Sequence, residues 1–249
     1  MATNQTVQRI AGRDKRLYTW AAVFIPIIVV IGFARSYYLK PFFNTPSLPS
    51  VLVHLHGIVM TGWVIMFVTQ VSLVAAHRTR LHQRMGVVGA ALAGAVVFVG
   101  LAVAIAAATR AVSASSGAAG GASQASAALQ FLVIPLVDMS VFAILIATAL
   151  YFRRRIEIHK RLMLLATLTL LSAAVARIPL HFIATGGPLV FFGLTDLLIL
   201  ACVAFDTVRN RRLHRAFLWA APLVIASQPL RLMIGGTDTW MRLAAWLVS

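Results

Sequence analysis

The sequence alternates between long apolar runs and short polar segments. A membrane-spanning helix needs about 20 mostly apolar residues, and seven of the runs are long enough. Their bounds are 17–34, 51–76, 86–109, 129–152, 161–185, 188–208 and 214–235. The pattern predicts an all-α polytopic membrane protein with seven transmembrane helices, whose membrane domain covers residues 17–235.

The two ends of the chain differ from this domain. Residues 1–16 form a basic segment, which we expect in the cytoplasm. The first apolar run is interpreted as a retained anchor, because no clear small-residue cleavage site ends it. Residues 236–249 predict a short extracytoplasmic amphipathic tail, in which Trp240 and Trp246 would suit the membrane interface.

The composition agrees with a membrane protein. Of the 249 residues, 60% are hydrophobic and 11% are charged, whereas soluble domains are about 45–50% apolar and about 25% charged. An ordinary soluble enzyme, a disordered protein and a coiled coil are therefore excluded. The single cysteine, Cys202, excludes an intramolecular disulfide and a thiolate metal cluster.

The net charge of +16 is explained by topology and does not indicate nucleic acid. Sixteen of the 22 lysines and arginines lie in residues 1–16 or in the segments after the second, fourth and sixth apolar runs. By the positive-inside rule this predicts an N-in, C-out protein of a bacterial cytoplasmic (inner) membrane. Some of these arginines are expected to bind anionic lipid head groups. They are Arg78, Arg80, Arg84, Arg153, Arg154 and Arg155.

Several polar side chains lie inside the apolar runs. A charged side chain at mid-membrane costs at least about 2.5 kcal/mol, so it needs a partner and usually has a purpose. We expect these residues to form one polar network in the outer half of the bundle. They are Gln70, Asp138, Arg177, Asp196, Gln228 and Arg231. Two interpretations stay open: an ion-pair network that staples helices together, or a cavity for a metal, a haem, or an anionic or polar ligand.

Histidines in the same outer half are candidate cofactor ligands. His56 lies near the outer end of the second run, and His181 near the outer end of the fifth run, where it would share a helix face with Arg177. His54 is a weaker metal candidate, because residues i and i+2 of a helix point about 200° apart. Neutral imidazole is a common metal ligand, so haem b or a divalent metal is a possible cofactor. The alternative is that each imidazole hydrogen-bonds a loop carbonyl.

A set of short motifs resembles a family of bacterial multi-span membrane proteins, the predicted membrane proteins of the 2306 domain-of-unknown-function type. The motifs are His56, Gln70, His82-x-Arg84-x-Gly86, and His159-Lys160-Arg161 with Arg177. The family often has His and Arg adjacent, whereas Gln83 and Lys160 intervene here. The resemblance implies a helical membrane bundle and no assigned activity.

A weaker likeness is to cytochrome b-type bundles, where histidines on facing helices hold haem. It implies an outer pair, His56 with His181, and an inner pair, His82 with His159. The histidines that share a span are 26 and 22 residues apart, or about 33–39 Å along a helix. This separation predicts that the inner pair lies in loops and favours a single outer haem.

These observations predict a multi-pass membrane protein with a polar ligand or cofactor site in the outer half of the bundle. A haem- or metal-dependent redox component is the leading interpretation. The alternatives are a metal-dependent membrane hydrolase, in which His56, His181 and an aspartate would bind the metal, and a non-catalytic transporter-like or accessory subunit with a membrane partner. Whether the protein is an enzyme stays open.

Overall fold

The computed structural model describes residues 2–116 and 120–249, with side chains described from Arg16 onward. Seven helices in these residues are long and apolar enough to cross a membrane. They are Arg16–Tyr38, Val51–Ala75, Thr79–Ser115, Gly121–Tyr151, Ile156–Val175, His181–Asn210 and Arg215–Gly235. The expected all-α fold with seven apolar spans is confirmed.

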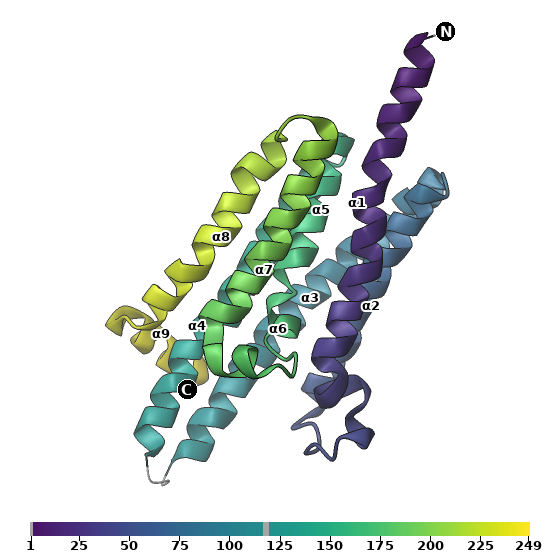
Figure 1. Ribbon diagram of the computed structural model, residues 1–249. Helices are drawn as coiled ribbons and strands as arrows, with labels where there is room; N and C mark the ends of the chain where they lie inside the picture. The colour runs from purple at the N-terminus through teal and green to yellow at the C-terminus, as the bar shows by residue number, and fades with distance from the viewer. Residues whose placement is uncertain (1, 117–119) are drawn as a thin grey trace.

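The helices follow one another with short connections (Figure 1). They are α1 (Ala2–Phe33), α2 (Val51–Ala75), α3 (Thr79–Ser115), α4 (Gly121–Tyr151), α5 (Ile156–Thr169), α6 (Ser172–Val175), α7 (His181–Asn210), α8 (Arg215–Gly235) and α9 (Asp238–Val248). A π-helical turn, Ala34–Tyr38, and a 3-10 turn, Lys40–Phe42, begin the connection between α1 and α2.

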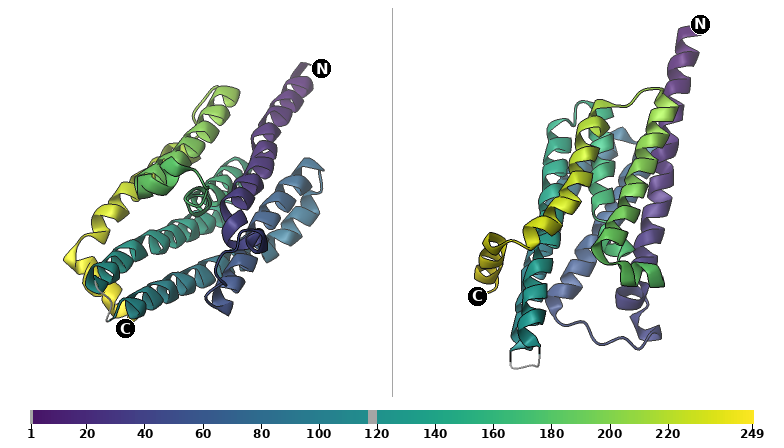
Figure 2. Two further views of the ribbon diagram at one scale, coloured as in Figure 1. Left: turned by 60° about the horizontal axis from the view of Figure 1, so that its bottom comes forward. Right: turned by 60° about the vertical axis from the view of Figure 1, so that its left-hand side comes forward.

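The two ends of the bundle carry different connections. The N-terminus lies at the same end as connections 76–78, 152–155 and 211–214, and we call this the basic end (Figures 1 and 2). The connections after α1 and α3, together with α9, lie at the opposite end. The six arginines expected to bind lipid are all exposed on or beside the connections of the basic end.

Helix α4 occupies the middle of the bundle and packs against α3, α5, α8 and α9. Its Phe142 is fully buried and meets Trp63 of α2 edge to face, with ring centroids 5.0 Å apart. Apolar side chains also cover much of the outer surface, including Phe98 of α3 and Ile144 of α4. A surface of this kind suits lipid, because hydrocarbon solvates apolar side chains on every face of a bundle.

The fifth span differs most from its prediction. It covers 156–175 and not 161–185. Hydroxyl groups of Thr167 and Thr169 donate to carbonyls three or four residues earlier, a pattern that competes with helical hydrogen bonding and bends helices. Pro179 then lacks the N–H that a continuing helix would need. As a result His181 begins α7, and the expected helix face shared by Arg177 and His181 is wrong.

Helix α7 is divided by a kink. Gly187 has φ 61° and ψ −157°, a backbone conformation that glycine adopts without steric cost. The long part that begins at Pro188 corresponds to the predicted sixth span, whereas the short part from His181 to Gly186 was not foreseen. The short part keeps His181 at the opposite end of the bundle.

The C-terminal helix α9 packs against α3, α4 and α8 (Figure 2). Trp240 is buried there, and its Nε1–H donates to the carbonyl of Leu129 at 2.9 Å. This contact ties α9 to α4, and the position of Trp240 at the membrane interface stays a prediction. Trp246 is 70% exposed, as a residue at the interface would be.

Candidate functional site

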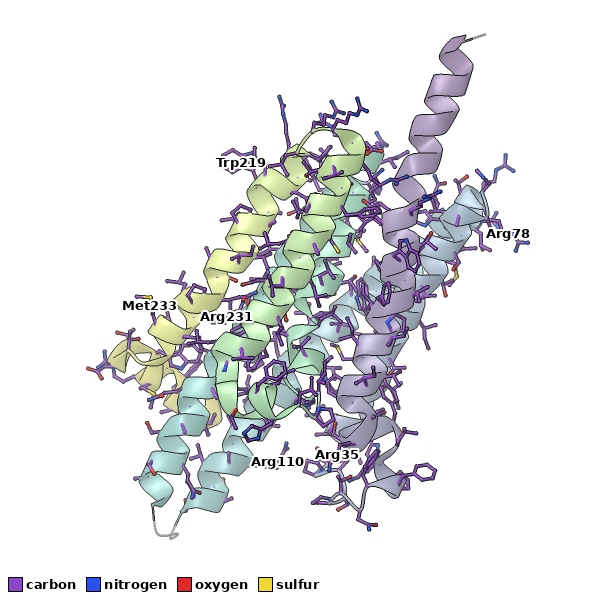
Figure 3. All side chains as sticks on the ribbon, in the orientation of Figure 1. Arg35, Arg78, Arg110, Trp219, Arg231 and Met233 are labelled. Carbon is purple, nitrogen blue, oxygen red and sulfur yellow. The ribbon has the colours of Figure 1, made fainter. Side chains whose placement is uncertain are left out.

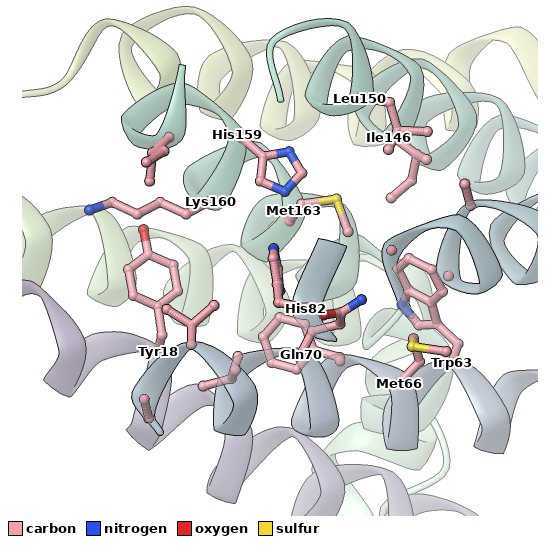
Figure 4. Close-up of a pocket in the computed structure, with 18 of the residues that line it drawn as sticks. Tyr18, Trp63, Met66, Gln70, His82, Ile146, Leu150, His159, Lys160 and Met163 are labelled. Atoms are coloured by element: carbon pink, nitrogen blue, oxygen red, sulfur yellow. The ribbon is translucent and has the colours of Figure 1, made fainter. Parts of the chain in front are cut away.

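A cavity of about 360 Å³ lies near the basic end, between α1 to α5. We call it the inner cavity. Its walls are mostly apolar and aromatic and include Trp63 (Figure 4). The polar side chains that line it are Tyr18, Thr19, Gln70, His82, Glu157, His159 and Lys160. An apolar cavity with a few convergent polar groups is typical of a small-molecule site.

Gln70 orients His82. The amide of Gln70 satisfies its surroundings when its nitrogen faces Nδ1 of His82 at 2.6 Å and the carbonyl of His82 at 3.3 Å. The amide oxygen then accepts from the backbone N–H of Gly86 at 3.1 Å. Nδ1 of His82 is the acceptor in this arrangement, so a neutral imidazole carries its hydrogen on Nε2.

His159 is held in the complementary form. Its Nδ1 lies 2.8 Å from the carbonyl oxygen of Ala149. A carbonyl can only accept, so Nδ1 donates and Nε2 of the neutral ring keeps its lone pair. The imidazoles of His82 and His159 point toward one another from α3 and α5 (Figure 4). One N–H donor and one acceptor nitrogen therefore face the same cavity.

The expectation that the inner pair lies in loops is wrong. Helix α3 begins at Thr79 and α5 at Ile156, so His82 and His159 both lie within helices. The apolar runs are shorter than these helices, because the first turns of α3 and α5 carry basic residues. Gln70 is also placed here and not in the outer network. The contacts between Gln70, His82 and Gly86 join residues that carry the family resemblance.

A buried ion-pair cluster beside the inner cavity was missed from the sequence. Arg161 is 2% exposed and forms a two-pronged pair with Asp206, at 3.0 Å from Nε to Oδ2 and 2.9 Å from Nη2 to Oδ1. Nη1 also donates to Glu157 at 2.6 Å. The available signal was Asp206, which is one of only six acidic residues and lies at the end of an apolar run.

Four residues of the expected outer network meet between α4, α7 and α8. Arg231 is ion-paired with Asp138 and also donates to the carbonyl and hydroxyl oxygens of Ser227. Gln228, one helical turn earlier, donates from Nε2 to Asp196 at 2.8 Å. These contacts favour the interpretation of a network that staples helices together. Asp138 is paired with Arg231 and Asp196 accepts from Gln228, so both carboxylates have a partner within the bundle.

Arg177 does not join that network. It lies in the connection between α6 and α7, where its Nη1 donates to the carbonyl of Ala173 at 2.7 Å. Its guanidinium carbon is 4.9 Å from the centroid of the Phe33 ring. Arg177 instead lines a second cavity, of about 330 Å³, at the opposite end of the bundle. We call this the outer cavity.

The outer histidines are not brought together. His56 lines the outer cavity, whereas His181 is exposed and does not line it. His54 is exposed beside the ring of Tyr37, because α2 already begins at Val51 and turns His54 and His56 to different sides. Within the described residues no three His, Cys, Asp or Glu side chains could hold one metal ion. The expected metal set of His54, His56 and His181 is therefore not formed, and neither is the set of His56, His181 and an aspartate that the hydrolase alternative needs.

Comparison with known proteins finds no matching family model, no significantly similar curated protein and no significantly similar solved structure. The family resemblance stays a prediction from the motif residues.

Proposed function

We propose that this multi-pass membrane protein binds a planar ring with carbonyl or hydroxyl oxygens, of the quinone type, in the inner cavity. The observation that carries the proposal is the pair of imidazoles, which offers one N–H and one lone pair to the same apolar space. A quinone oxygen would accept from Nε2–H of His82. A hydroquinone hydroxyl would donate to Nε2 of His159.

The remaining walls suit such a ring. Trp63 and Phe67 offer aromatic faces for a planar ligand, and Met66 and Met163 are side chains that adapt to irregular shapes. Glu157 lines the cavity and is 54% exposed at the basic end. Its carboxylate is paired with Lys160 and Arg161.

A second candidate for the same two histidines is haem, which would supply one-electron transfer when bound. The hydrogen bond from Nδ1 of His159 to Ala149 favours it, because metal-ligating histidines usually donate their other nitrogen in this way. His82 would then need a bare Nε2. That requires the Gln70 amide to turn and face the N–H of Gly86 with its own NH₂ group. The hydrogen bonding of Gln70 therefore supports the quinone-type ligand better.

Optical spectroscopy and titration separate the two candidates. The protein, purified in a neutral detergent, would be titrated with a short-chain benzoquinone, and binding would be followed by quenching of tryptophan fluorescence. We expect His82→Phe and His159→Phe each to weaken binding by about tenfold, the loss of one hydrogen bond in an apolar site. The matched control is His54→Phe, which changes an exposed histidine outside the cavity.

Two results would contradict the proposal. One is unchanged quinone affinity in both cavity variants. The other is a Soret band in the purified protein that disappears in His82→Phe and His159→Phe, which would select haem. Quinone extracted from the purified wild type and absent from these variants would support the proposal independently of the titration.

We also propose that the basic end faces the cytoplasm of a bacterial cell and that its exposed arginines bind anionic lipids. The charge asymmetry between the two ends supports this orientation. A C-terminal alkaline phosphatase fusion should be active and a C-terminal green fluorescent protein dark. The reverse pattern would overturn the orientation.

A further inference from the structure

The outer cavity holds positive charge without a counter-charge. Arg110 of α3 and Arg177 both line it, and none of its lining residues is acidic. Arg110 forms no hydrogen bond or ion pair with any described residue. It projects from α3 at the opposite end of the bundle (Figure 3). A half-buried guanidinium with no protein partner is costly in a membrane protein.

The other arginines inside the bundle are treated differently. Arg161 pairs with Asp206, and Arg231 pairs with Asp138. Arg177 has only the carbonyl of Ala173 and the face of Phe33. The outer cavity is therefore the place in this bundle where cationic side chains are available to bind a ligand.

A third group points to a ligand. His56 also lines the outer cavity, and its Nδ1 is buried with no hydrogen-bond partner. Buried polar atoms are nearly always paired. Arg110, Arg177 and His56 line the same cavity, so an anionic group bound in it would meet two guanidinium groups beside the imidazole.

We infer that the outer cavity binds an amphipathic carboxylate, with its head group at Arg110, Arg177 and His56. Guanidinium groups match the two oxygens of a carboxylate. The rest of the wall is apolar and would contact the body of the ligand, which a small inorganic anion lacks. The apolar residues include Val29, Phe33, Met60, Val64, Val103 and Leu171.

The connection between α1 and α2 closes the cavity. Tyr38 hydrogen-bonds Thr61 at 2.9 Å. The ring of Tyr37 packs directly against Gly57, where an added Cβ atom would lie only 2.3 Å from the ring. Both tyrosines line the cavity. The ligand is thus held between the bundle and an ordered cap.

Calorimetric titration of the full chain in dodecyl maltoside tests this inference. The probes are octanoate, octanol as its uncharged match, and inorganic phosphate. We expect saturable octanoate binding that Arg110→Gln and the double variant with Arg177→Gln weaken by at least about tenfold, the loss of a charged hydrogen bond. Arg35→Gln is the matched control, because Arg35 lies at the same end over the ring of Phe43 and does not line the cavity.

Each other outcome would overturn the inference. Octanol binding as tightly as octanoate would show that the arginines are not used. Phosphate binding as tightly would show that the apolar wall is not used. Equal octanoate affinity in wild type and Arg110→Gln would remove the head-group site. Arg110→Gln is informative even if the double variant fails to fold, since Arg110 has no hydrogen bond or ion pair with a described residue to lose. Quinone binding in the inner cavity should be unchanged in it.

Discussion

The inner and outer cavities share a wall, Trp63, but differ in how their charges are balanced. Beside the inner cavity, Arg161 is neutralised by Asp206. The two charged side chains that line the cavity, Glu157 and Lys160, are paired with one another. In the outer cavity Arg110 and Arg177 have no acidic neighbour. With only six acidic residues against 22 basic ones, the positions of the acids decide which cavity suits a neutral ligand and which suits an anion.

The largest expected effect on stability comes from removing a buried charge beside the inner cavity. Asp206→Asn removes the carboxylate from a fully buried guanidinium, and we expect a loss of about 4 kcal/mol in the free energy of unfolding. The measurement is reversible unfolding in detergent. Glu157→Gln is the control, because this carboxylate is half exposed and its pair with Arg161 should contribute less than about 1 kcal/mol. Equal losses in both variants would contradict the difference in burial.

Removing the side chain of Trp63, which lines both cavities, should lower the free energy of unfolding by less than Asp206→Asn does. Trp63 is buried against Phe142, and Trp63→Ala joins the two cavities at an expected loss of about 3 kcal/mol from packing and cavity creation. Thermal unfolding measures it, with the exposed Trp246→Ala as a control that should change stability by less than about 0.5 kcal/mol. A small effect of Trp63→Ala would mean that the wall is not part of the packed core.

A pair of variants should separate the two binding sites. Gln70→Leu removes the group that orients His82, so we expect about tenfold weaker quinone binding and unchanged octanoate binding. Arg177→Gln should have the reverse effect. The measurements are the fluorescence and calorimetric titrations described above. If either variant weakens both ligands, the two cavities do not act as separate sites.

The smallest effect concerns pH at the basic end. Nδ1 of His214 accepts from the N–H of Ala216 at the start of α8. Burial, followed by the nearby charge of Arg161, lowers the pKa of His214 below its ordinary 6.5. The unfolded chain therefore takes up the proton first, so stability is complete above about pH 6.5 and falls as the pH decreases below it.

We expect this loss to be about 1 kcal/mol, the usual contribution of a helix N-cap. It is measured as the change in unfolding temperature between pH 8 and pH 5. His214→Asn retains a capping side chain that does not titrate, so this variant should keep its stability at low pH and become more stable than wild type there if His214 is responsible. An unchanged pH profile in His214→Asn would assign the effect to another group.

The seven spans could be predicted because a membrane crossing needs one uninterrupted apolar length, which is visible along the chain. The prediction failed at the fifth span for a local reason. Side-chain hydroxyls of Thr167 and Thr169 compete for backbone carbonyls, and Pro179 follows closely. These features lie inside a run that is apolar on average. A prediction from hydropathy alone therefore extended the fifth helix beyond its actual end and placed Arg177 and His181 inside it.

The sequence by itself determined the number of spans, the gathering of basic residues at one end of the bundle, and the need of Asp138 and Arg231 for partners inside it. Only the tertiary structure decided how those partners are shared. Asp206 pairs with Arg161 across 45 positions, and Asp138 with Arg231 across 93, whereas Arg110 and Arg177 have no acidic partner among the described residues. The physical reason is that hydropathy is a property of consecutive residues, whereas an ion pair depends on which helix faces which. That is set by the packing of the whole bundle.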